Sequence, residues 1–170
     1  MQKAPIRPPR CCARRVSAWI MRSEAGMSLS ITDIFPQGNP YLEALGVEVL
    51  EYGNDRAVMA LKLKPEFMNS WHVAQGGISM TLLDVAMGLS ARAGAPDAKS
   101  SATVEMSTSF LQPAGHAGDT IIARGHTYHR STTMCFCQAE LFNGDRLVAK
   151  AMGTFKLIRR LDISRKLDQE

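Results

Sequence analysis

The chain has 170 residues, which favours one domain with room for a hydrophobic core. Its hydrophobic content of 45% excludes a disordered protein, and no uninterrupted apolar run approaches the roughly 18 to 20 residues of a membrane span. The formal net charge is +4, but residues 1–26 carry six basic residues against one Glu, so the remaining chain is close to −1. The charge therefore gives no support to a nucleic-acid or membrane partner for the domain.

Residues 1–26 are predicted to form a basic extension outside the folded domain. Three prolines among the first nine residues oppose a helix, and the segment lacks the continuous apolar stretch of a secretion signal. Met27 is the predicted natural start, with a disordered basic arm and a targeting segment as the alternatives. We therefore divide the chain into an extension (1–26), a single domain (27–160) and a charged tail (161–170).

Residues 40–65 predict two strands around the turn sequence YGND, with Pro65 ending the second strand. A loop is expected over 64–75. Residues 76–92 then predict one long helix, ended near Gly94 and Pro96.

The predicted helix has two apolar stripes when residues are placed at about 100° per step. One stripe consists of Ile78, Leu82, Val85 and Leu89, and the other of Met80, Leu83, Met87 and Ala91. A helix that is apolar on two sides is a buried helix. The second stripe therefore predicts contact with a second copy of the chain.

Four strands are expected after the helix. Residues 101–114 alternate, with Val104, Met106, Thr108 and Phe110 on one face and Thr103, Glu105, Ser107 and Ser109 on the other. Residues 118–130, 132–142 and 146–158 supply the other three, with a tight turn at 143–145. Two strands, one helix and four strands predict an α+β fold in which the helix covers an antiparallel sheet.

The cysteines give no sign of a disulfide or a metal site. Cys135 and Cys137 are two apart on one predicted strand, where Cα atoms lie roughly 6.5 Å apart, so a bridge between them would be strained. The chain has no CxxC pair with which to build a zinc site. We expect both to be buried, reduced thiols of a cytoplasmic protein.

Asp84 is the candidate catalytic group, because the predicted helix has no Lys or Arg at i±3 or i±4 to pair with it. The alternative is a merely solvated side chain. Gly76 and Gly77 begin the helix, where free N–H groups can polarise a carbonyl, although a simple glycine turn would look the same. Gly76 and Asp84 are roughly 12 Å apart along the helix. If both act on one carbon atom, they must come from different subunits.

Three segments carry a family resemblance: NSWHVAQGGISMTLLDVAMG (69–88), TVEMSTSFLQPA (103–114) and AKAMGTF (149–155). They resemble the hot-dog fold acyl-CoA thioesterases, most closely the branch associated with phenylacetate degradation, over about residues 39–158. The resemblance implies a six-stranded antiparallel sheet wrapped around one long helix. It also implies a dimer or dimer of dimers with active sites between subunits. No separate cofactor is implied, because coenzyme A is part of the substrate.

The resemblance also implies roles for individual residues. Asp84 would activate water or attack the thioester directly. The N–H of Gly76 would polarise the thioester carbonyl, and Gly77 would contact the substrate. The remaining implied site residues are Asn69 in the loop before the helix, Thr103 holding the water or the carboxylate, and Arg130, Ser131 and Thr132 as coenzyme A contacts. For Arg130 a solvated strand end is the alternative.

Gln75 is a departure, because the family usually has His before the two glycines. An amide can hydrogen-bond a carbonyl but cannot titrate near neutral pH, which weakens any scheme that needs an imidazole there. It keeps open a second hypothesis, a hot-dog protein that binds acyl-CoA without hydrolysing it, and argues against a hot-dog dehydratase. The acyl group cannot be read from the sequence. The candidates for lining the acyl pocket are Met59, Met80, Met87 and Phe110. For each of them, packing in the hydrophobic core is the favoured interpretation.

Overall fold

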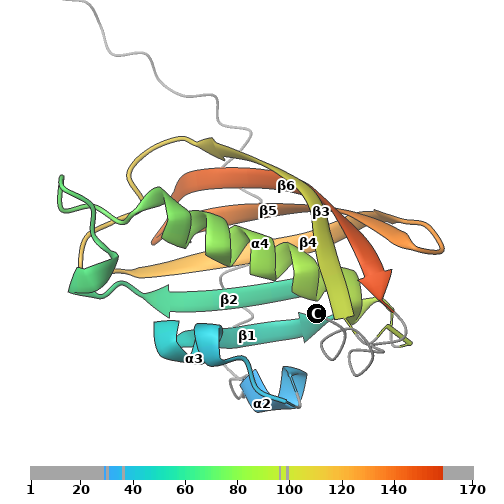
Figure 1. Ribbon diagram of the computed structural model, residues 1–170. Helices are drawn as coiled ribbons and strands as arrows, with labels where there is room; N and C mark the ends of the chain where they lie inside the picture. The colour runs from blue at the N-terminus through green and yellow to red at the C-terminus, as the bar shows by residue number, and fades with distance from the viewer. Residues whose placement is uncertain (1–28, 30, 36, 96, 99, 159–170) are drawn as a thin grey trace, which may run out of the picture.

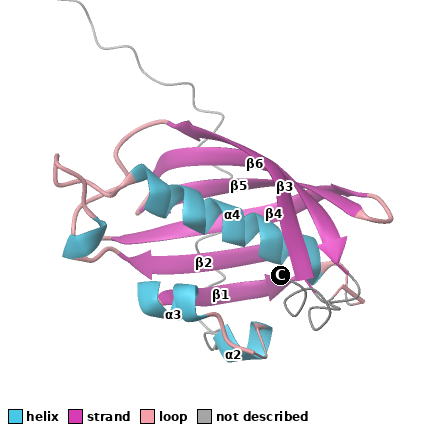
Figure 2. Cartoon of the chain, in the orientation of Figure 1, coloured by secondary structure: helices cyan, strands magenta, loops and turns pink. Residues whose placement is uncertain are grey.

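The protein folds as one six-stranded antiparallel sheet with a long helix across one face (Figure 1, Figure 2). The computed structural model describes residues 29, 31–35, 37–95, 97–98 and 100–158, so the predicted extension 1–26 and tail 161–170 lie outside the described residues. The strands are β1 (Val47–Gly53), β2 (Arg56–Lys62), β3 (Ser100–Phe110), β4 (Thr120–Arg130), β5 (Met134–Asn143) and β6 (Arg146–Ile158), in the sheet order β1-β2-β4-β5-β6-β3. This confirms the α+β class and the hot-dog arrangement. None of the described helices is long and apolar enough to cross a membrane.

The hairpin predicted around YGND is present. Asn54 and Asp55 both have positive φ (50° and 60°), which is the backbone of a two-residue turn between antiparallel strands. Gly53 pairs with Arg56 on either side of it. A local signal was therefore sufficient to fix this connection.

The prediction of a single helix was wrong. Short helices α2 (Ile31–Ile34) and α3 (Pro40–Leu45) precede the sheet, and a 3₁₀ turn, η1 (Pro65–Phe67), follows β2. Helix α3 begins because the Asn39 side chain accepts the N–H of Leu42 and Pro40 occupies the first turn. It ends at Gly46, whose φ of 80° is left-handed. The first strand consequently starts only at Val47.

The long helix, α4 (Gly76–Ala93), agrees with the prediction and ends at Gly94. The inference from its two stripes was wrong, however. Leu83, Met87 and Ala91, from the second stripe, are fully buried against the chain's own sheet, as is Leu82 from the first. Apart from exposed Met80, the second stripe therefore packs against the chain's own sheet and gives no evidence for a partner subunit. Among the predicted pocket residues, Met59 is also a fully buried core residue.

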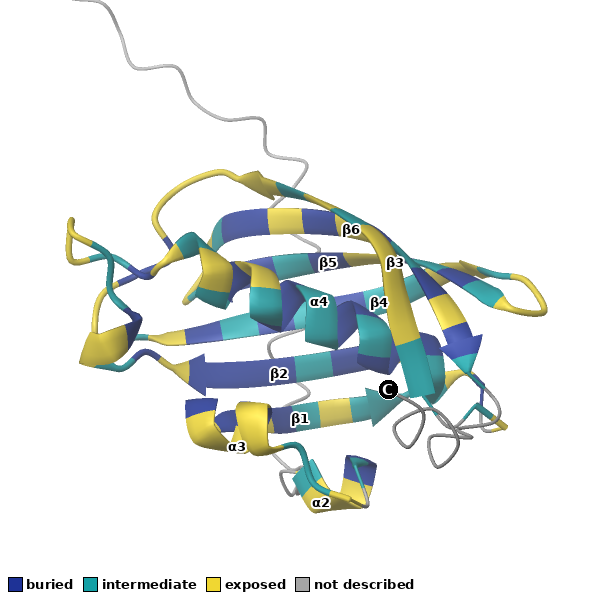
Figure 3. Ribbon diagram, in the orientation of Figure 1, coloured by how far each residue is buried: buried dark blue, intermediate teal, exposed yellow. Residues whose placement is uncertain are grey.

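Strand β3 forms one edge of the sheet, and its residues are half-buried or exposed along its whole length (Figure 3). Its pairing with β6 is irregular between Thr103 and Glu105. A bulge of this kind inserts one residue, and the residues beyond it change faces. Thr103 consequently pairs with buried Phe155, and Met106 pairs with buried Gly153. The predicted strict alternation was wrong at this point: Thr103 shares a face with Met106, and Val104 is 59% exposed.

The other side of α4 packs directly on the middle of the sheet. A Cβ atom at Gly125 on β4 would lie 2.9 Å from the backbone nitrogen of Met87, so only glycine permits this approach. Cys135 and Cys137 on β5 are fully buried free thiols, as predicted. Loss of solvation raises the pKa of both thiols.

Candidate active site

Asp84 lies in the middle of α4 on the side that faces β3. Its carboxylate is half-buried and accepts a hydrogen bond from the hydroxyl of Thr103, with Oγ1 and Oδ1 2.7 Å apart. One turn further along the helix, the hydroxyl of Ser101 donates to the carbonyl of Gly88 at 2.9 Å. These two bonds align β3 with α4. They leave Asp84 held by one neutral donor and open toward solvent on the free edge of the sheet.

Gly76 and Gly77 occupy the first turn of α4, after Gln75 in the extended N-cap position. The N–H groups of both glycines have no hydrogen-bond acceptor among the described residues. A Cβ atom added to Gly76 would lie 3.4 Å from the ring of Phe110 on β3, whereas one added to Gly77 would meet nothing within 4 Å. Two backbone donors are therefore available at the helix N-terminus, with an aromatic ring beside the first of them.

The loop before α4 is held by Asn69. Its side-chain Oδ1 accepts the N–H of Trp71 at 2.9 Å and that of Val73 at 3.4 Å. The backbone N–H of Gln75 donates to the carbonyl of Phe67 at 2.8 Å, while the Gln75 side chain is exposed and makes no cap hydrogen bond. In this chain Asn69 thus orders the loop that presents Gly76.

Arg130 lies at the far end of β4. Its guanidinium forms an ion pair with Asp55 in the β1–β2 turn, and it donates to the carbonyl of Ala91 at 2.8 Å and to the sulfur of Cys135 at 2.9 Å. Ser131 and Thr132 follow it and are exposed in the β4–β5 turn. Through Asp55 and Ala91, the guanidinium therefore ties the β1–β2 turn to the last part of α4. A role in binding coenzyme A stays a prediction for Arg130, Ser131 and Thr132.

The predicted site residues thus form three groups within one chain: Asp84 with Thr103, Gly76 and Gly77 beside Gln75 and Asn69, and Arg130 with its turn. Asp84 is roughly 12 Å along the helix from Gly76. A groove of about 470 Å³, lined by residues that include Arg56, Arg124 and Glu140, contains none of them. The contact between Phe110 and Gly76 was not predicted. Alternation along a strand assigns Phe110 to one face of the sheet but does not identify the residues that it contacts there.

Comparison with known proteins identifies the family. Residues 72–150 match the model of the thioesterase superfamily. A protein of Saccharolobus solfataricus named "Putative esterase" is 30% identical over 131 residues, which cover 76% of this chain and 91% of that protein. This chain belongs to the thioesterase superfamily. The family and the esterase relative support a hydrolase of the thioester or ester class.

Solved structures agree with this assignment. The phenylacetic acid degradation protein PaaI of Thermus thermophilus, solved as a mutant, is 25% identical, with a TM-score of 0.65 over 71% of this chain and all of that one. A Streptococcus mutans protein bound to acetyl CoA is 23% identical, with a TM-score of 0.59 over 64% of this chain and 86% of that one, and it shows the fold alone. The thioesterase-superfamily chain thus lies in the PaaI-like branch that its motifs indicated.

Proposed function

We propose that this thioesterase-superfamily protein hydrolyses acyl-CoA thioesters to a free acid and coenzyme A. The observation that carries the proposal is the carboxylate of Asp84, which the Thr103 hydroxyl holds in place on a helix whose other charged residue is Arg92, two turns further on. A carboxylate held in this way can remove a proton from water or attack a carbonyl itself. Coenzyme A thioesters are the first substrates to try, because a Streptococcus mutans protein of the same fold binds acetyl CoA.

In the proposed reaction the thioester oxygen accepts the N–H of Gly76, which stabilises the negative charge that develops on it. In one route water adds to the carbonyl carbon as Asp84 takes its proton, and the carbon–sulfur bond then breaks with loss of coenzyme A as its thiolate. In the other route Asp84 adds to the carbon, the carbon–sulfur bond breaks with loss of the thiolate, and water then cleaves the resulting anhydride. The scheme requires only protein groups and water.

We further propose that each site is shared by two copies of the chain. Asp84 is too far along α4 from Gly76 of its own chain to reach a carbon held there. Strand β3 is an edge strand with one unpaired side, and its Val104 is 59% exposed. An edge of this kind favours pairing with another strand, and a second copy would bring its Asp84 toward Gly76 of the first. A dimer and a dimer of dimers both satisfy this requirement.

The first test is release of coenzyme A thiol by wild type and by Asp84→Asn, which keeps the shape of the side chain but not its charge. We expect turnover by wild type and a loss of at least 100-fold in kcat, with substrate binding retained. An Asp84→Asn enzyme with nearly full turnover would refute the proposed chemistry.

The donor at Gly76 can be tested with a matched pair. Gly76→Pro removes the N–H at a helix position that tolerates proline, whereas Gly76→Ala adds a Cβ atom and keeps the N–H. We expect Gly76→Pro to lose about 100- to 1,000-fold in kcat and Gly76→Ala much less. Equal losses would mean that the backbone donor is not used.

Sharing of the site can be tested by co-expressing Asp84→Ala and Gly76→Pro chains, each inactive alone. A mixed dimer contains one site with both groups intact, so activity should return. If purified mixed dimers stay inactive while wild type is active, each chain holds its own complete site.

The second hypothesis, binding of acyl-CoA without hydrolysis, rests on Gln75 in place of the usual His. Its exposed amide cannot titrate near neutral pH. Saturable acyl-CoA binding by wild type with no thiol release across a substrate panel would support this hypothesis over the hydrolase.

A further inference from the structure

The first turn of α4 lies beside a surface that the proposed reaction does not yet use. Phe110, from the end of β3, is 54% exposed although it lies on the helix-facing side of the strand, in register with buried Ala149. The atoms nearest to an added Cβ at Gly76 are both in the Phe110 ring, at 3.4 and 3.5 Å. The ring therefore covers one side of the backbone that carries the proposed oxyanion donor.

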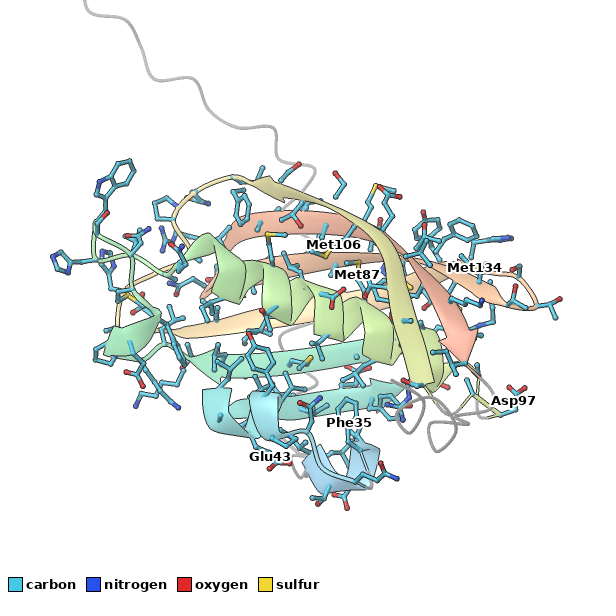
Figure 4. All side chains as sticks on the ribbon, viewed as in Figure 1. Phe35, Glu43, Met87, Asp97, Met106 and Met134 are labelled. Atoms are coloured by element: carbon cyan, nitrogen blue, oxygen red, sulfur yellow. The ribbon has the colours of Figure 1, made fainter. Side chains whose placement is uncertain are left out.

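Apolar side chains continue this surface toward Asp84. Met80 is four residues from Gly76 and four from Asp84, so the three lie close to one helix face, and Met80 is 39% exposed. Met106, labelled beside α4 in Figure 4, extends from β3 and is only partly buried against the core. These side chains form an apolar strip that begins at Gly76 and extends along α4 toward Asp84 of the same chain.

The structure separates the four methionine and phenylalanine candidates for the acyl pocket. Met59 and Met87 are completely buried and belong to the core, whereas Met80 and Phe110 remain accessible. An exposed aromatic ring next to a functional backbone group loses contact with water when a ligand covers it, and this burial favours binding of apolar ligands.

We propose that Phe110 and Met80 bind the acyl group, that the enzyme takes apolar acyl thioesters, and that the Phe110 ring limits their size. This inference rests on the proposed function. With the thioester oxygen on the N–H of Gly76, the acyl carbons lie beside the reacting carbon and within contact of the ring that covers Gly76. Acyl groups that end in a carboxylate would lose their hydration on this apolar strip and gain no partner from it.

The test is the ratio of kcat/KM for decanoyl-CoA to that for butyryl-CoA, with succinyl-CoA as the charged comparison. We expect Phe110→Ala to raise the decanoyl-to-butyryl ratio about tenfold or more, and Phe110→Leu to raise it less. Wild type should use succinyl-CoA poorly. The control is Leu111→Ala. Leu111 is adjacent to Phe110 and equally exposed at 54%, but none of its atoms lies within 4 Å of a Cβ atom added to Gly76. Its ratio should equal that of wild type.

Three results would separate the explanations. No turnover of any thioester by wild type would refute the proposed function itself. An active wild type with an unchanged ratio in both Phe110 variants would refute the role of Phe110 alone. A uniform loss for all substrates together with a lower molecular mass in solution would assign Phe110 to a subunit interface, which would also overturn the inference.

Discussion

The hydroxyl of Thr103 donates to the carboxylate of Asp84 across the junction of β3 and α4, although the two residues are 19 positions apart in the chain. The contact depends on the irregularity in β3 between Thr103 and Glu105, which turns Thr103 toward the helix. A bulge next to a reactive side chain is a recurrent way of aiming one residue at another. It makes Thr103 a positioning residue for the proposed general base or nucleophile.

We expect Thr103→Val to lower kcat for acyl-CoA hydrolysis by about 10- to 100-fold with little change in KM. The variant keeps the shape of the side chain but removes a hydrogen bond to a charged group, which typically contributes about 1.5–3 kcal/mol. The measurement is steady-state thiol release at several substrate concentrations.

The control for this prediction is Thr103→Ser, which retains the hydroxyl and should recover most of the wild-type kcat. If the valine and serine variants lose activity equally, packing of the Thr103 methyl group rather than the hydrogen bond to Asp84 is responsible.

Arg130 connects three parts of the fold, and we expect this connection to contribute to stability. Arg130→Met leaves the carbonyl of Ala91 without its charged donor, and should lower the free energy of unfolding by about 1.5–3 kcal/mol. Asp55→Asn weakens only the ion pair, whose side chains are 23% and 47% exposed, and should cost about 1 kcal/mol or less. Urea unfolding of both variants checks the difference, and equal losses would contradict it.

The predicted role of Arg130 in binding coenzyme A can be separated from this structural role. An acyl-pantetheine thioester lacks the nucleotide phosphates that a guanidinium would contact. If Arg130 binds those phosphates, wild type should prefer acyl-CoA to acyl-pantetheine in KM, and Arg130→Met should largely lose the preference. A preference that survives in the folded variant would leave Arg130 with the structural role alone.

The sequence predicted those features that depend on neighbouring residues. The β1–β2 turn at Asn54 and Asp55, and the limits of α4 at Gly76 and Gly94, are set by local backbone preferences and were correct. Helix α3 was missed even though Asn39 and Gly46 carry ordinary capping signals, because the hydrophobic pattern of the following strand was extended too far back.

Features that depend on pairing between distant segments could not be predicted. The bulge that directs Thr103 to Asp84 is set by the register of β3 against β6, which leaves no mark on the alternation of β3 itself. The contact of Phe110 with Gly76 likewise requires the strand and the helix to be placed together. Helical periodicity identified the apolar residues of α4 correctly but could not show that one sheet buries residues from both stripes.

Gly125 provides a stability test of the contact between α4 and the sheet. A Cβ atom there would collide with the carbonyl of Ala86 and lie 2.9 Å from the nitrogen of Met87, and neither backbone group can move independently of the helix. Gly125→Ala should therefore lower the free energy of unfolding by about 1–3 kcal/mol. The comparison is Gly77→Ala, where nothing lies within 4 Å and a gain of up to about 1 kcal/mol is expected. A neutral Gly125→Ala variant would contradict the close packing of α4 on β4.

The last prediction concerns Asp119, which orders the loop before β4. Its carboxylate accepts the backbone N–H of His116 at 3.0 Å and the side-chain amide of Asn143 at 2.9 Å. These bonds, with the His116 bond first, hold the pKa of Asp119 below its ordinary value of 3.8. The same loop presents the carbonyl of Gly115 to the N–H of Ala74 at 2.8 Å, directly before α4 begins.

Because the pKa is lowered by folding, the ionised carboxylate stabilises the native state fully above pH 3.8, and this contribution is lost as the pH falls through the folded-state value. Asp119→Asn keeps an acceptor oxygen but has no charge to titrate. The difference in thermal unfolding midpoint between wild type and Asp119→Asn should therefore be largest well above pH 3.8 and should shrink as the solution is acidified below it. A difference that stays constant over this range would show that the hydrogen bonds do not depend on the charge of Asp119.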